Sequence, residues 1–151
     1  MEKTSIQRAK ELRQVALRVV YFQDNGEYSY LNKFQEVTSW ISKECRELSL
    51  VQGETAEDEA LICVSILAGY NVTVRDSKII QRVMKRAFRV IGELKPSFLK
   101  CQLLTYCFSE TYDDKLATEA GKIIGDWTEL DEDKMRLKEM LGDLKRVAEL
   151  A

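Results

Sequence analysis

A run of apolar residues between Phe98 and Phe108 constrains this chain more than any other stretch. Eight of its eleven positions are apolar. A helix that is apolar almost all round is normally buried on several sides, so the run predicts a central helix. It is too short to cross a bilayer, which takes about 20 apolar residues. Pro96, the single proline of the chain, is expected in the first turn of this helix, where a missing N–H is tolerated.

A second helix is predicted directly after this run. Asp113 and Asp114 supply a cap and negative charge for its first turn, which the helix dipole favours. The small residues Ala117, Ala120 and Gly121 follow three and four apart, so another backbone can come close to this helix. Together the two helices are expected to form an αα-hairpin with a short connection.

Five further segments carry apolar residues at helical spacing. They span about residues 4–21, 31–48, 55–69, 76–94 and 128–150, the last beginning at Thr128 or Asp131. Thr4 and Gln7 fit a capping box at the start of the first segment. Thr55 precedes three acidic residues, which makes it a good N-cap for the third.

Turn-forming residues separate these segments. Asp24-Asn25-Gly26-Glu27 is a strong turn signal after the first one. Gly69-Tyr70-Asn71 closes the third, because glycine and asparagine most easily take the left-handed conformation at a helix C-terminus. The sequence therefore predicts a single all-α domain over residues 1–151, a bundle of six or seven helices built from αα-hairpins. The helices at 55–69 and 98–108 should lie inside, with the charged helix at about 130–150 outside.

The composition excludes several classes of protein. With 45% hydrophobic residues, 32% charged residues and one proline, the chain is typical of a helix-rich globular protein. It has no histidine, the commonest general base, and no nucleophile elbow, phosphate loop or metal-protease motif. We therefore expect neither an enzyme nor a cofactor.

The cysteines and the amino terminus bear on the cellular compartment of the protein. Cys45, Cys63, Cys101 and Cys107 show no metal-binding spacing, so they are expected to be small core residues in a reducing compartment. The charged amino terminus lacks the apolar segment of a secretion signal. The prediction is a cytoplasmic protein without membrane contact.

Charge is distributed unevenly along the chain. With 23 basic and 25 acidic side chains, the net charge of −2 gives no general attraction to nucleic acid. The stretch from Arg75 to Lys100 differs, because it holds eight basic and two acidic residues. Five of these basic residues fall on one face of the helix predicted over 76–94, opposite its apolar stripe. Like charges at this spacing repel one another, so the face is expected to have a partner.

Three partners fit this basic face. One is an acidic protein surface, and another is an acidic segment of the same chain, either Glu54–Glu59 or Glu129–Asp133. The third, RNA or DNA, is the least favoured, because no aromatic side chain is interleaved with the basic ones and Phe88 is expected to face away.

Two stretches of the chain are distinctive, GETAEDEALICVSILAGYN at Gly53–Asn71 and SFLKCQLLTYCFSETYDDKLATEAGKII at Ser97–Ile124. Both resemble the UpxZ family of transcription antiterminator antagonists. The likeness extends from TSIQRAKEL near the amino terminus to about Trp127 and is weakest between Val72 and Leu94. The resemblance implies a regulator, associated with capsular polysaccharide loci of gut bacteria, that binds and inhibits a NusG-like antiterminator from a competing locus. By binding, it would cover the surface through which that factor contacts RNA polymerase or the leader RNA.

A surface for such a partner is predicted on the basic face and the neighbouring corner at Tyr70, which is expected to be an exposed aromatic anchor. Its residues are Tyr70, Asn71, Arg75, Lys78, Arg82, Lys85, Arg86 and Arg89. The alternative is a helical protein that contacts RNA polymerase or the leader RNA directly. In either case a monomer or weak dimer is expected, and a scaffold that dimerises through its last helix would show a concentration-dependent size.

Overall fold

The computed structural model describes residues 2–25 and 31–150, with side chains placed for residues 2–19 and 33–150. Within these ranges the chain forms seven α-helices, one 3-10 turn and no strand, which confirms the predicted all-α fold. The helices are α1 (Ser5–Asn25), α2 (Leu31–Leu48), α3 (Ala56–Tyr70), α4 (Ser77–Val90), α5 (Phe98–Thr111), α6 (Asp114–Gly125) and α7 (Glu132–Leu150), and the 3-10 turn η1 (Ile91–Glu93) follows α4.

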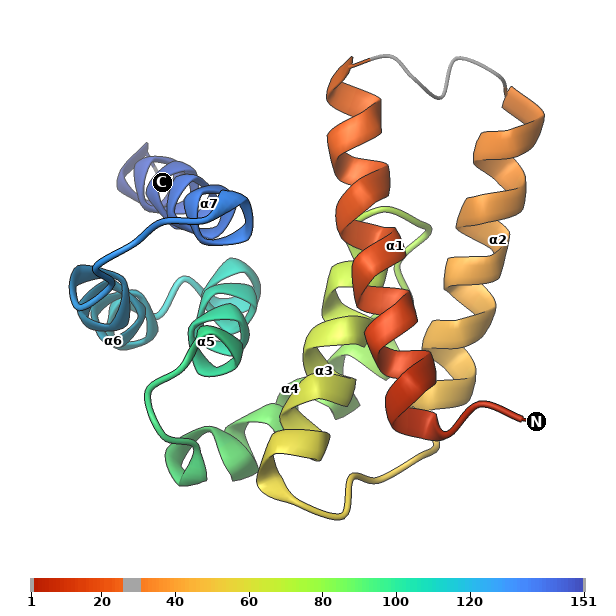
Figure 1. The fold of residues 1–151 in the computed structure, drawn as a ribbon, viewed down its shortest axis with the longest axis horizontal. Helices are drawn as coiled ribbons and strands as arrows, with labels where there is room; N and C mark the ends of the chain where they lie inside the picture. The colour runs from red at the N-terminus through yellow and green to blue at the C-terminus, as the bar shows by residue number, and fades with distance from the viewer. Residues whose placement is uncertain (1, 26–30, 151) are drawn as a thin grey trace.

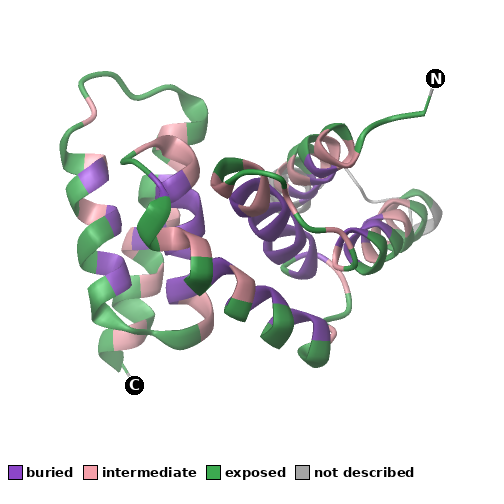
Figure 2. Ribbon diagram, turned by 90° about the horizontal axis from the view of Figure 1, so that it is seen from below, coloured by how far each residue is buried: buried purple, intermediate pink, exposed green. Residues whose placement is uncertain are grey.

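Two helices form the centre of the structure. The helix α3 contacts α1, α2, α4 and α5, and α5 in turn contacts α6 and α7. Every residue from Ala60 to Tyr70 and from Lys100 to Phe108 is buried (Figure 2). Figure 1 shows α1 and α2 as a long hairpin on one side of α3, with α5, α6 and α7 on the other. The nearly continuous apolar runs in α3 and α5 therefore correspond to helices that are covered all round.

Side-chain caps explain where most helices begin. The Gln7 N–H donates to Thr4 Oγ1 (3.1 Å) while the Thr4 N–H donates to Gln7 Oε1 (2.8 Å), as predicted for a capping box. The other capped helices use one side-chain oxygen each, from Thr55 for α3, Asp76 for α4, Ser97 for α5, Asp113 for α6 and Asp131 for α7. The predictions for Thr55 and Asp113 are thus confirmed.

Two predicted helix boundaries are wrong, the end of α1 and the start of α5. The helix α1 continues to Asn25 rather than ending near Tyr21, and the predicted turn residues Gly26-Glu27 lie outside the described residues. Pro96 does not enter the first turn of α5, because Ser97 takes the capping position and Phe98 is the first helical residue.

The predicted left-handed cap after α3 is also wrong. Asn71 has φ −77°. Its N–H donates to the Ala68 carbonyl (3.2 Å) and the Val72 N–H donates to the Gly69 carbonyl (3.1 Å), so the chain leaves α3 in a right-handed conformation. The left-handed conformation occurs after α5 instead, at Tyr112 with φ 53°. There the Tyr112 ring packs edge-on against Phe108 with ring centroids 5.5 Å apart, which offsets part of the backbone strain.

Candidate protein-interaction surface

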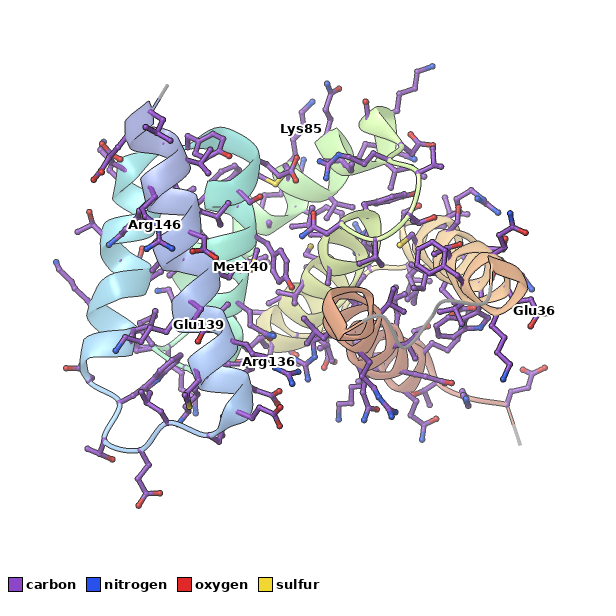
Figure 3. All side chains as sticks on the ribbon, turned by 90° about the horizontal axis from the view of Figure 1, so that it is seen from above. Glu36, Lys85, Arg136, Glu139, Met140 and Arg146 are labelled. Carbon is purple, nitrogen blue, oxygen red and sulfur yellow. The ribbon has the colours of Figure 1, made fainter. Side chains whose placement is uncertain are left out.

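The helix α4 is buried along one side and exposed along the other. Its apolar stripe packs into the core through Ile79, Ile80, Val83, Met84 and Ala87. On the opposite side Lys78, Arg82, Lys85 and Arg89 are exposed, and none of them forms a salt bridge with a described residue. We call these four residues the basic face. In Figure 3, Lys85 projects from α4 away from the rest of the protein.

Arg86 does not belong to this exposed face, although the sequence placed it there. Its Nε and Nη2 donate to the two carboxylate oxygens of Glu59 at 2.7 and 2.6 Å. Further bonds run to the carbonyls of Ser49 (3.2 Å) and Val51 (2.5 Å). The two side chains of this pair are only 11% and 12% exposed. For Arg86 the partner is therefore an acidic residue of the same chain, from the segment 54–59 that was one of the predicted alternatives.

The Glu59 carboxylate connects three parts of the chain. It bonds Arg86 on α4, it lies in the first turn of α3, and its Oε1 accepts the N–H of Gly53 in the preceding loop at 2.9 Å. Hydrogen bonds from Arg86 hold the pKa of Glu59 below its ordinary value, although burial acts in the opposite direction. We call Gly53, Glu59 and Arg86 the loop clamp.

Arg75 and Asn71 are exposed, as predicted, but they are linked to each other and to α5. The Arg75 Nη2 donates to Glu110 Oε1 at 2.5 Å, and Nη1 donates to Asn71 Oδ1 at 3.4 Å. The Arg75 side chain remains 45% exposed. The Glu110 side chain is 18% exposed, so the pair is open to solvent on its Arg75 side, and a solvent-screened pair contributes about 1 kcal/mol or less to stability.

Tyr70 is not the exposed aromatic anchor that the sequence predicted. The residue is 2% exposed, within the core that joins α3 to its neighbours. Burial raises the pKa of its hydroxyl to about 12, and this hydroxyl makes no hydrogen bond to a described residue. The prediction failed because α3 extends one residue further than expected and carries Tyr70 into the core.

Tyr70→Phe is therefore expected to leave the free energy of unfolding unchanged or to raise it by up to about 1 kcal/mol, since no hydrogen bond within the protein is lost. Urea denaturation of both proteins would measure the change. A loss of more than about 1 kcal/mol would mean that the hydroxyl has a bonding partner in solution.

A groove of about 440 Å³ runs beside the basic face. Its apolar lining comes from Ile80, Met84 and Phe88 of α4, and Lys85 and Glu110 stand at its rim. Phe88 is 45% exposed, so the expectation that it faces away from the basic side chains is wrong. Phe88 comes one turn after the buried Met84, so helical spacing alone assigns Phe88 to the buried stripe and gives no sign of its exposure. Aromatic residues, Phe included, and arginine are enriched at protein–protein interfaces relative to the rest of the surface.

The four cysteines are not activated as nucleophiles. All four cysteines are buried and free; burial raises the pKa to about 12 for Cys45, Cys63 and Cys107 and to about 11 for Cys101. They are therefore protonated at neutral pH and poor nucleophiles. The described residues contain no cluster of three or more His, Cys, Asp or Glu that could hold a metal ion. Nor does any helix in that part of the chain have the length and apolarity to cross a membrane.

Comparisons with known proteins place the chain in a family. The family model of the UpxZ family of transcription anti-terminator antagonists matches residues 9–109. The structure is similar to the crystal structure of a transcription anti-terminator antagonist UpxZ from Bacteroides uniformis, with a TM-score of 0.86, 28% sequence identity and coverage of 95% of this chain and 94% of that one. No curated protein matches the sequence. Because the family match covers most of the chain, from within α1 to most of α5, this chain belongs to the UpxZ family of transcription anti-terminator antagonists.

Proposed function

We propose that this protein binds NusG-like antiterminators encoded by competing capsular polysaccharide loci and inhibits them by occlusion. The bound helices would cover the surface that the antiterminator needs for RNA polymerase or for the leader RNA. Inhibition in this form requires binding and no catalysis, and it takes place in the cytoplasm, where transcription occurs. The antagonist role comes from the family, and the identity of the target and of the loci comes from the resemblance.

The basic face supports a protein partner for this function. Four cations stand exposed without an ion pair to any residue of the described chain, beside a groove floored by apolar side chains. A phosphate backbone would use the charges but not the groove, whereas a protein surface can use both. We therefore infer a partner patch that is acidic with an apolar centre, with Phe88 taking the anchoring role that was predicted for Tyr70.

Charge reversal on the basic face tests this function. The double variant Arg82→Glu, Arg89→Glu changes two exposed side chains and leaves the loop clamp intact. We expect it to weaken capture of purified NusG-like antiterminators at least tenfold, because two attractive charge pairs become repulsive. Binding would be measured by biolayer interferometry against factors from several capsule loci. A matched control is Lys122→Glu, Lys138→Glu, which makes the same change of charge on exposed residues of α6 and α7 and should bind as the wild type does.

Each outcome decides a different point. If the charge-reversed variant still captures an antiterminator, the proposed function stands and the interface lies on another surface. If no antiterminator is captured by the wild type, the function itself fails, and direct contact with RNA polymerase or leader RNA becomes the candidate. Salt dependence then distinguishes RNA polymerase from leader RNA as the partner. The affinity for a phosphate backbone falls by about 10³ or more between 50 and 200 mM salt when six phosphates are contacted.

A further inference from the structure

A second and larger cleft lies between α1 and α7, on another side of the protein from the basic face. It has a volume of about 600 Å³. Its walls come from Ala16 and Leu17 of α1 and from a series of α7 residues between Asp133 and Leu144, and its floor is formed largely by α5. Figure 3 shows Arg136, Glu139 and Met140 on the part of α7 that faces α1.

The cleft is open because α7 packs against α5 and α6 while its contact with α1 is slight. Leu137 and Leu141 are the buried residues of α7, and they leave the side facing α1 uncovered. Met140, Leu144 and Val147 follow at i, i+4 and i+7, so they form one apolar stripe along that side. Met140 and Leu144 are half-buried at the cleft, whereas Val147 is 52% exposed further along the helix. An apolar stripe of this length on a water-soluble helix is normally covered.

The floor of the cleft is polar at one place. Gln102 is buried, and its Oε1 accepts a hydrogen bond of 3.0 Å from Arg13 Nη1, which fixes its orientation. Tyr106 lies one turn further along α5 and also lines the cleft. Burial raises the pKa of Tyr106 to about 12, so the hydroxyl is neutral and able to donate. Apolar walls with a few fixed polar groups are the usual composition of a binding cleft.

The rim of the cleft is acidic. Asp133, Glu139 and Asp143 line it together with one basic residue, Arg136. Arg136 is paired with Glu132 one turn earlier, and Asp143 is paired with Arg146. Glu139 is exposed and forms no ion pair with any residue in the described ranges. Asp133 interacts with Arg13, the residue that bonds Gln102 at the floor. Glu139 is therefore the rim carboxylate that has no basic partner among the described residues, and it favours a positively charged occupant, the opposite of what the basic face favours.

We propose that this cleft binds a basic amphipathic helix of a protein partner, with its apolar side chains between α1 and α7 and its lysine or arginine residues against the acidic rim. The α7 wall of the cleft, from Asp133 to Leu144, is about 17 Å long at 1.5 Å per residue, which matches roughly three turns of a bound helix. Recognition of this kind uses apolar anchors at i, i+3 or i+4, and i+7. The inference is independent of the proposed function, because it concerns another surface and partner chemistry of opposite charge.

A pair of synthetic peptides tests the cleft. Both are 18 residues long with the same leucine stripe at helical spacing; one carries lysines and the other glutamates beside the stripe. By fluorescence anisotropy we expect the lysine peptide to bind the wild-type protein at least tenfold more tightly than the glutamate peptide. Glu139→Lys, Asp143→Lys should remove or reverse this preference, and Met140→Asp should weaken binding of the lysine peptide at least tenfold.

The controls distinguish binding in the cleft from a folding defect and from binding at the basic face. Glu139 and Asp143 are exposed, so their variant should keep the fold even if Met140→Asp does not, and circular dichroism would verify this. The variant Arg82→Glu, Arg89→Glu should bind the lysine peptide as the wild type does. Equal affinity for both peptides would overturn the proposal, as would binding that is unchanged in the charge variant. A wild-type dimer in sedimentation analysis that Met140→Asp dissociates would also overturn it, because the occupant would then be a second copy of this chain.

Discussion

Arg86→Ala is expected to lower the free energy of unfolding by about 3–5 kcal/mol, the usual cost of removing one partner from a buried ion pair. The substitution leaves the Glu59 carboxylate, which is only 12% exposed as a side chain, without its two hydrogen bonds from the guanidinium. It also leaves the carbonyls of Ser49 and Val51 without that donor. Urea denaturation followed by circular dichroism would measure the loss.

The control for Arg86→Ala is Arg82→Ala on the same helix. Arg82 is exposed and forms no ion pair with the described residues, so its removal should change the free energy of unfolding by no more than about 0.5 kcal/mol. If the two alanine variants were equally stable, the buried pair between Arg86 and Glu59 would not exist in solution.

The pH dependence of stability gives an independent check on the loop clamp. Since Arg86 lowers the pKa of Glu59 below its ordinary value of 4.5, the unfolded state binds a proton at a higher pH than the folded state does. The contribution of this carboxylate is therefore fully present above pH 4.5 and is lost as the pH falls through the lowered pKa. In Arg86→Ala this part of the acid-induced loss of stability should be absent. The difference in free energy of unfolding between variant and wild type should therefore shrink as the solution is acidified.

Gly53→Ala is expected to cost at least about 2 kcal/mol, because the new methyl group has no space. A Cβ atom on Gly53 would lie 2.3 Å from the backbone nitrogen of Glu59 and 2.6 Å from its Cα. Both are backbone atoms in the first turn of α3, so a side-chain rotation cannot relieve the contact. Any shift of the loop would also lengthen the hydrogen bond from the Gly53 N–H to the Glu59 carboxylate. Thermal and urea denaturation would measure the effect.

Gly142→Ala is the matched control for Gly53→Ala. Apart from its chain neighbours and the backbone of its own helix, no atom lies within 4 Å of the position that a Cβ on Gly142 would take, and the residue lies inside α7. Alanine is a better helix former than glycine, so this change should be neutral or stabilising by up to about 1 kcal/mol. If both variants lost stability equally, the cost would come from glycine replacement in general and not from the close approach of the loop to α3.

The loop clamp also changes how the interface must be tested. A charge reversal at Arg86 would combine a folding defect with any loss of partner binding, and the two could not be separated. Arg82 and Arg89 avoid this problem, since both are exposed on the side of α4 that faces solvent.

Most of the secondary structure could be predicted from the sequence, because it depends on neighbouring residues. The apolar periodicity gives the helices, and Thr55 and Asp113 give two of the starts, since a capping hydrogen bond reaches only two or three residues along the chain. The continuous apolar runs likewise identified α3 and α5 as the central helices. Helix ends were less predictable. Asn71 suits a left-handed cap, and no neighbouring residue in the sequence indicates that it takes the right-handed conformation instead.

The candidate surfaces depended on contacts between residues far apart in the chain. Spacing places Arg86 and Arg89 on the same side of α4, but only the packing of α3 against α4 brings Glu59, 27 residues earlier, within hydrogen-bonding distance of Arg86. In the same way the burial of Tyr70 and the exposure of Phe88 follow from which neighbours cover them. The cleft between α1 and α7 exists because the last helix packs on α5 and α6. The sequence by itself determined the helices and their amphipathic faces, since these follow from local propensity and spacing; tertiary structure decided which side chains remain free for a partner, since burial and ion pairing depend on how those helices meet.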